Sequence, residues 1–269
     1  MAITTLDSII AGLQPPTYYA KGLSGTNVVG RAYSWWRAIN SISGDAAAPA
    51  GGVGGETLVS PVRGELMRRD PVSGNAYLAR FVCHAGQVGQ VTLADRIWQN
   101  SGLSVTSTAV QSIASPTWPA RDEDGATLGK GFMLAVEIQS VMGAGGPTIT
   151  VSYTNSAGVA GRTGTNKVSA SGSSPAGTFY VVELQDGDAG VRSVQSIQLS
   201  GSWTSGALSL VAYRPLVHAA ITGSHQPVTY DAMRLGLPRI YDGTVYFLTT
   251  IPLANSGVNV FGQIIEAHG

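Results

Sequence analysis

Four histidines and one cysteine are the side chains in this sequence best suited to act as nucleophiles, bases or metal ligands. His84, His218, His225 and His268 lie on separate segments, and no two have metal-ligand spacing. Cys83 adjoins His84, but neighbouring residues of a strand point to opposite faces, so these two side chains should not meet. No Gly-x-Ser-x-Gly elbow occurs. The sequence predicts no serine-hydrolase, cysteine-nucleophile or zinc site, and Cys83 is expected in the core.

Two glycine-rich acidic segments resemble ion- or phosphate-binding loops without completing either pattern. Gly125–Gly131 reads GATLGKG, which is one residue short of phosphate-loop spacing and lacks the hydroxyl residue after Lys130. Asp122–Gly125 and Asp186–Gly190 resemble calcium turns, but Ile197 takes the twelfth position, where a calcium loop needs Glu. We expect solvated turns that need no ion, and we predict no catalytic residue, no cofactor and no metal. An enzyme is the least favoured class, since the carboxylates show no glycosidase pairing.

The composition is unusually neutral for a globular chain of 269 residues. Charged residues make up 12%, and 16 basic residues balance 16 acidic ones, giving zero net charge. No electrostatic excess attracts nucleic acid or anionic lipid, no run of apolar residues is long enough to span a membrane, and no basic leader precedes Lys21. A neutral protein associates with its own kind more readily. We therefore expect assembly in a cytoplasm, without nucleic-acid or membrane partners.

A helix is predicted at the amino terminus. Thr4 and Asp7 have the spacing of a capping box, and Pro15 and Pro16 end the pattern after Gln14. Four apolar residues fall at i, i+3, i+4 and i+7 and so share one face: Leu6, Ile9, Ile10 and Leu13. A helix this short is marginal alone in water, so its stripe needs a docking surface, either on this chain or on another subunit.

An aromatic group follows the helix and precedes a low-complexity stretch, Asp45–Gly55, which reads as a flexible loop. Its members are Tyr18, Tyr19, Tyr33, Trp35 and Trp36. Such residues are common at interfaces, so the segment is interpreted as an extended arm that packs on a neighbour. The alternative is that these residues close one end of the core. The predicted organisation is residues 1–70 as a docking or bridging helix and arm, and residues 71–269 as the body.

Short strands with period-two alternation dominate the body. They are expected at Asn75–His84, Lys130–Val141, Thr148–Asn155, Gly177–Leu184, Val191–Leu199, Gly206–Arg214, Thr244–Leu253 and Val258–Ile265. One further short helix is expected within Thr229–Leu235, capped by Thr229 or Asp231 and ended by Gly236. Strands without interleaved helices indicate an all-β fold, namely an antiparallel, jelly-roll-like β-sandwich with a short N-terminal helix and an extended arm.

Several segments resemble a group of tailed-bacteriophage virion structural proteins, in order along most of the chain. They are ITTLDSIIAGLQPP (3–16), LADRIWQNSG (93–102), SPTWPARD (115–122), TITVSYTNSAGVAGRT (148–163) and DAGVRSVQSIQLSGSWTSGALSLVAYRPL (188–216). The resemblance implies a role in the head or tail of a phage particle assembled in the host cytoplasm. No catalytic residue belongs to the group, so none is transferred to this chain.

A capsid decoration or stabilising protein is the favoured interpretation, with the major capsid protein or another virion protein as partner and a homo-oligomer, guessed as a trimer. The predicted interface residues are Leu6, Ile9, Ile10, Leu13, Tyr18, Tyr19, Trp35 and Trp36. The first alternative is a tail, neck or baseplate structural protein. The second is a carbohydrate- or receptor-binding β-sandwich module, in which Trp98, Trp118 or Trp203 would stack on sugar rings from an exposed platform.

Overall fold

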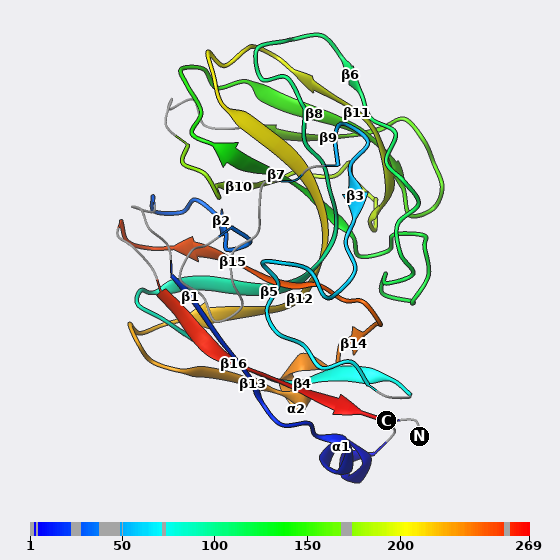
Figure 1. The fold of residues 1–269 in the computed structure, drawn as a ribbon, viewed down its shortest axis with the longest axis vertical. Coiled ribbons are helices and arrows are strands. Elements are labelled where there is room, and N and C mark those ends of the chain that lie inside the picture. The colour runs from blue at the N-terminus through cyan, green and yellow to red at the C-terminus, as the bar shows by residue number, and fades with distance from the viewer. Residues whose placement is uncertain are drawn as a thin grey trace. The chain divides into compact units, whose positions relative to one another are not determined.

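A computed structural model describes residues 3, 5–22, 28–37, 49, 51–71, 74–167, 174–255 and 259–269. Over these residues the regular secondary structure is mostly antiparallel strands, with two short helices, α1 (Leu6–Gly12) and α2 (Ala232–Leu235), as Figure 1 shows. The predicted all-β antiparallel class with a short N-terminal helix is therefore confirmed.

The chain forms two compact units, each made of segments distant in sequence. Unit 1 comprises Met1–Ala47, Val59–Asp95 and Leu216–Gly269, and unit 2 comprises Ala48–Leu58 and Arg96–Pro215. This division does not coincide with the boundary at residue 70 suggested by the sequence. Strand pairing joins the amino-terminal segment to the carboxyl-terminal strand, so sequence order does not separate an arm from a body. Residues 45–48 and 50 of the low-complexity stretch lie outside the described residues.

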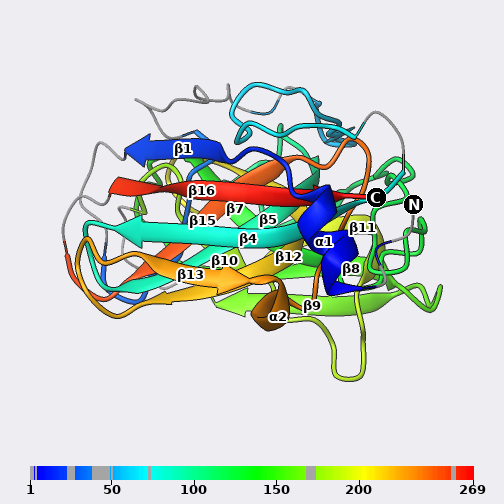
Figure 2. The same ribbon diagram turned by 90° about the horizontal axis from the view of Figure 1, so that it is seen from below.

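Unit 1 has one sheet in the order β1 (Thr17–Gly22), β16 (Asn259–His268), β4 (Ala76–Ala85) and β13 (Val228–Asp231), with β14 (Arg239–Ile240) also paired to β4. Strands β1, β16, β4 and β13 lie side by side in Figure 2. In addition, β15 (Tyr246–Pro252) pairs with β2 (Tyr33–Ser34) and with β5 (Gly89–Gln99). Buried side chains from both groups, such as Phe81 and Leu248, form one hydrophobic core. Burial of such side chains is the main source of this unit's stability.

Unit 2 has a sheet in the order β6 (Gln111–Ser112), β11 (Val191–Leu199), β8 (Thr148–Asn155) and β9 (Arg162–Lys167). It also contains β7 (Met133–Ser140) paired with β10 (Phe179–Val181) and with β12 (Ala207–Ile221), and β3 (Glu56–Thr57) paired with the end of β5. A second core is formed here, around Trp118 and Phe132.

The alternating pattern located several half-buried strands correctly. The bounds of β8 and β11 match the prediction, and Ile149, Val151 and Tyr153 of β8 point inward with no exposed surface. β5 was not predicted, because it is buried on both faces over most of its length and therefore does not alternate. β9 and β1 were also missed, and β1 lies in the segment interpreted as an arm.

The second predicted helix is present but shorter than expected. Asp231 caps α2 by accepting from the Arg234 amide, and Gly236 ends it with a left-handed φ of 66°. Residues before Asp231 pair with β4 as strand β13 instead of joining the helix, because pairing satisfies their backbone groups at the sheet edge. Of the two caps considered, Asp231 is the one used.

Candidate functional site

The amino-terminal helix is capped one residue later than the sequence suggested. The Thr5 side chain accepts a hydrogen bond from the Ser8 amide at 3.2 Å, and the Ser8 hydroxyl receives one from the Thr5 amide at 3.0 Å. Thr4, which was expected to form the cap with Asp7, lies outside the described residues. Asp7 remains in the first turn, where its charge favours the helix dipole.

The segment that carries α1 is held on unit 1 of its own chain. Gly12 lies so close to the end of β16 that a Cβ atom there would be 2.4 Å from the His268 carbonyl oxygen. The Gln14 amide donates to the Glu266 carbonyl at 2.8 Å, and β1 then pairs with β16 from Thr17 onward. These contacts hold the carboxyl end of α1 against the edge of the sheet.

Two apolar residues of α1 and its C-cap, Leu13, are exposed. Leu6 is 61% exposed, Ile10 58% and Leu13 43%, while Ile9 is half-buried. We call Leu6, Ile10 and Leu13 the helix stripe. Tyr18 on β1, also predicted as an interface residue, is 61% exposed. Apolar groups at this exposure gain free energy when another surface covers them.

The other three predicted interface residues belong to the core of unit 1. Tyr19 stacks on Phe81 and donates to the Val82 carbonyl at 3.0 Å, and Trp35 donates its indole N–H to the Thr250 hydroxyl at 2.9 Å. Tyr19, Trp35 and Trp36 are at most 2% exposed. The prediction that these three residues are surface anchors is therefore wrong. The alternative prediction, that aromatic residues of this segment close the core, is correct for them. Large aromatic rings contribute most to stability when they are fully buried. The sequence order does not show which rings of the segment are buried.

In the loop that resembled a phosphate-binding loop, the backbone amides bind the carboxylate of Asp122. One carboxylate oxygen of Asp122 accepts from the amides of Asp124 and Ala126 at 3.0 and 2.7 Å. The other accepts from the amides of Gly129 and Lys130 at 3.0 and 3.4 Å. Asp122 is 1% exposed, so this carboxylate is not solvated as predicted, whereas Glu123 and Asp124 of the same turn are exposed. The loop amides bind the chain's own carboxylate in place of a phosphate.

The second acidic turn is also closed by protein donors. Asp188 accepts hydrogen bonds from Tyr153 at 2.6 Å, from Arg162 at 2.9 Å and from Asn155 at 2.6 Å. These contacts, led by the Arg162 guanidinium, lower the pKa of Asp188 from 3.8 to about 2 despite the opposing effect of desolvation. The carboxylate therefore stays charged and ties β8 and β9 to the turn that precedes β11.

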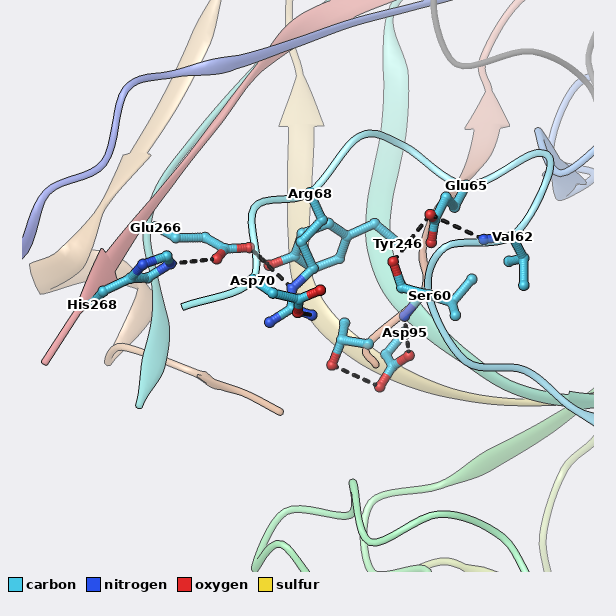
Figure 3. A network of polar contacts seen from close by, with 11 residues as sticks. Ser60, Val62, Glu65, Arg68, Asp70, Asp95, Tyr246, Glu266 and His268 are labelled. Carbon is cyan, nitrogen blue, oxygen red and sulfur yellow. Dashed lines mark hydrogen bonds and ion pairs between the residues drawn. The ribbon is translucent and has the colours of Figure 1, made fainter. Parts of the chain in front are cut away.

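A buried polar network in unit 1 surrounds Glu266, as Figure 3 shows. Its carboxylate accepts from the Tyr246 hydroxyl at 2.8 Å, lies 3.4 Å from Nε of Arg68 and is 3.0 Å from Nε2 of His268. Burial, reinforced by the charge of Glu266, raises the pKa of Tyr246 well above its usual value. The phenol therefore remains a donor, and the network links Arg68 to the end of β16. It supports the strand that holds α1.

A second buried network, in unit 2, was not found from the sequence. Arg96 on β5 pairs with Glu137 on β7 at 2.6 Å, and Gln99 and Gln139 hydrogen-bond to the same two side chains. Arg96 and Glu137 are at most 1% exposed. Two charged residues, Asp95 and Arg96, among the apolar residues of Leu93–Trp98 were the only signal in the sequence, and nothing there identified the partner of Arg96.

The thiol and the imidazole next to it are kept apart, as predicted. Cys83 is fully buried, and burial raises its pKa to about 12, so it is not a nucleophile at neutral pH. His84 points to the other face of β4 and stacks with Phe261 at 5.3 Å between ring centroids. No cluster of three or more His, Cys, Asp or Glu suited to a metal ion occurs among the residues that the structure describes.

The three tryptophans proposed to form an exposed sugar-binding platform are buried. Trp98 is fully buried, Trp118 is 1% exposed and Trp203 is 2% exposed. The rings of Trp98 and Trp118 lie 5.9 Å apart in the core of unit 2, so none of these three residues presents an open face to a sugar ring.

Comparisons with known proteins identify neither a family nor a fold for this chain. No family model matches the chain, and no curated protein matches it. Among solved structures, the VP2 subviral particle of infectious bursal disease virus is 10% identical, with 96% of this chain and 80% of that chain covered and a TM-score of 0.21. A mutant VP2 of the same virus is 11% identical, covering 94% and 62%, with a TM-score of 0.13. Scores this low identify no shared fold.

No helix among the described residues is long and apolar enough to cross a membrane.

Proposed function

We propose that this chain is a non-enzymatic structural component of a bacteriophage particle, specifically a decoration or stabilising protein bound to the major capsid lattice. The proposal joins the sequence resemblance to tailed-phage virion proteins with one structural observation. That observation is an apolar helix stripe held against the sheet of unit 1 and exposed among the residues that the structure describes: Leu6, Ile10 and Leu13.

An uncovered stripe suits a protein whose partners are other subunits. Each apolar side chain that becomes fully buried contributes about 1.5–3 kcal/mol, and repetition over a lattice adds avidity. A ligand that binds only the assembled shell stabilises that shell by mass action. Zero net charge favours close association, because neighbouring copies experience no net long-range repulsion.

The reactive side chains with assigned contacts serve the fold. Asp122 and Asp188 accept hydrogen bonds from their own loops, Glu137 is paired with Arg96, and Cys83 is buried. A structural role therefore accounts for each of these groups without a substrate. The carbohydrate-binding alternative loses support, since the tryptophans it relied on lie in the core.

Incorporation into particles tests the proposal. We expect Ile10→Asp, and deletion of residues 1–16, to leave a folded chain that no longer joins the particle. Val110→Asp is the matched control, since Val110 is equally exposed at 58% but lies in unit 2. If both altered chains were fully incorporated, the helix would not be part of the contact with the particle.

Position in the particle separates the decoration role from its nearest rival. We expect immunogold label over the head surface and a high copy number. Label confined to the tail, neck or baseplate would replace decoration with that alternative. Turnover of a substrate by the purified chain, abolished by a change to one polar side chain, would overturn the structural role altogether.

A further inference from the structure

We infer that Asp186 is a site of spontaneous isomerisation to isoaspartate, through a ring that its side chain forms with the amide nitrogen of Gly187. The inference goes beyond the proposed function and does not depend on it. The sequence contains three Asp-Gly pairs, at 124–125, 186–187 and 242–243, and the structure places them in different surroundings. The difference between these surroundings carries the inference.

The reaction needs no reactant other than water. The Gly187 nitrogen attacks Cγ of the protonated Asp186 carboxyl group, an N–Cγ bond forms, and the carboxyl hydroxyl leaves as water with the amide proton. Water then opens the cyclic imide. If the N–Cγ bond breaks, aspartate returns. If instead the bond from nitrogen to the main-chain carbonyl carbon breaks, the backbone runs through Cγ as isoaspartate. One water is released and one is consumed, so the product is an isomer.

Both reacting groups of this pair are accessible. Asp186 and Gly187 are exposed, at the centre of a turn in which the Asp188 amide donates to the Gln185 carbonyl at 3.1 Å. Among the residues that the structure describes, neither the Asp186 carboxylate nor the Gly187 amide has a hydrogen bond or an ion pair. The nitrogen and the carboxyl group can therefore approach each other without breaking a contact of their own.

Gly187 supplies the freedom that ring closure requires. Its φ is 83°, and a Cβ atom placed there would have no heavy atom within 4 Å, so the turn is open on that side. Because glycine lacks a side chain, its nitrogen is unhindered and the backbone around it rotates more readily than at any other residue.

Arg162 contacts the peptide group that reacts. Its Nη2 donates to the Asp186 main-chain carbonyl at 3.1 Å, while its Nε donates to the Asp188 carboxylate at 2.9 Å. A cation at this carbonyl oxygen withdraws electrons from the peptide group, so the Gly187 N–H becomes more acidic and the carbonyl carbon more electrophilic. In isoaspartate this carbonyl becomes a carboxylate beside the guanidinium, which strengthens the hydrogen bond. Arg162 is therefore a positioning residue that favours isoaspartate over the return of aspartate.

The pair at Asp124 and Gly125, also in unit 2, is a natural control. The Gly125 amide donates to the Asp122 carbonyl at 3.1 Å, and the Asp124 carboxylate accepts from Nζ of Lys130 at 3.1 Å. Ring closure at this pair must break both contacts. We expect it to be slower than at Asp186 by roughly tenfold, since one amide hydrogen bond and one exposed ion pair are lost.

The third pair, Asp242 and Gly243, lies in the turn between β14 and β15. The Thr244 amide closes this turn on the Tyr241 carbonyl at 3.1 Å, and the Gly243 carbonyl accepts from the Ser60 amide at 3.0 Å. The second contact ties the glycine to a separate segment, which restricts its rotation. We therefore expect less isoaspartate at 242 than at 186.

Ageing of the purified full-length chain tests the site. The protein is kept at mildly acidic pH in heavy-oxygen water, so that every imide that opens acquires one heavy oxygen. Peptide mass spectrometry locates the label, and electron-transfer fragmentation separates isoaspartate from aspartate. We expect roughly tenfold more label at Asp186 than at Asp124. Equal labelling of the two positions, or more at Asp124, overturns the inference.

The same experiment in urea shows whether the fold or the sequence selects the site. Urea removes the contacts that distinguish the pairs, and each of them has glycine after aspartate. We therefore expect labelling at 124, 186 and 242 to become similar. If Asp186 keeps its lead in urea, local sequence causes the difference and the structural inference fails.

Two kinds of variant test the roles of the individual groups. Asp186→Glu keeps the charge but needs a larger ring, so labelling at this position should be lost. Arg162→Ala should lower the ratio of isoaspartate to labelled aspartate at 186, and Arg162→Lys, which keeps a cation, should restore part of it. A looser turn alone would change the total label in Arg162→Ala and leave this ratio as in the wild type, which would contradict the role of Arg162. Labelling that persists in Asp186→Glu would contradict the site itself.

Discussion

Gly12 of α1 and His268 of β16 touch through their backbones, and the position of the His268 carbonyl oxygen leaves no space for a side chain at residue 12. This contact joins the two ends of the chain. It also sets the direction in which α1 presents its stripe, because the Gln14–Glu266 hydrogen bond follows directly.

Gly12→Val should displace α1 from the sheet. Overpacking of this kind costs about 1–3 kcal/mol, and here it acts on a short helix with few other contacts. We expect faster hydrogen exchange and proteolysis within residues 6–14 while the rest of unit 1 stays protected. Ala11→Val, at an exposed neighbouring position, is the control. Unchanged protection in Gly12→Val would mean that the glycine is not required for docking.

Asp122→Ala should destabilise unit 2, because four loop amides lose the carboxylate that accepts from them. Charged hydrogen bonds of this type are worth about 1.5–3 kcal/mol, so a loss of about 3 kcal/mol in the free energy of unfolding is expected. Urea denaturation measures it, with Asp124→Ala, an exposed neighbour, as control. Because the loop's own amides hold the carboxylate, neither calcium nor a chelator should change the melting temperature. A calcium-dependent rise of several degrees would contradict the assignment.

Arg162→Ala should reduce stability in a pH-dependent way. The lowered pKa of Asp188, about 2 against 3.8, means that its contribution is fully present above about pH 4 and is lost as pH falls towards 2. The difference in unfolding free energy between wild type and variant should therefore be largest at neutral pH and shrink towards zero in acid. Arg192→Ala, an exposed residue on β11, is the control. A difference that stays constant with pH would contradict this ion pair.

Glu137→Ala should be among the most damaging single changes in unit 2. It leaves the buried guanidinium of Arg96 without its carboxylate, which typically costs 3–5 kcal/mol. Thermal unfolding measures the loss. Lys130→Ala, which breaks the exposed pair with Asp124, should have little effect since solvent screens that pair. Equal losses of stability in the two variants would mean that burial does not determine how much each ion pair contributes to stability.

The sequence alone determined the class of fold and the position of several half-buried strands, β8 and β11 among them. In β8, the alternation of Ile149, Val151 and Tyr153 with polar residues is a local signal, since side chains of a strand alternate between a wet and a dry face. The caps of α2, Asp231 and Gly236, are local in the same sense. The exclusion of Cys83 as a nucleophile also followed from adjacency within one strand.

Only the tertiary structure decided which side chains face solvent and which distant groups meet. Trp35 and Tyr18 look alike as aromatic residues of one segment, yet one is buried and the other exposed, because burial depends on strands more than two hundred residues away. The partners of Arg96 and Glu266 have the same origin. Pairing of strands that are distant in sequence decides which of these groups meet. Local sequence patterns do not show which strands pair.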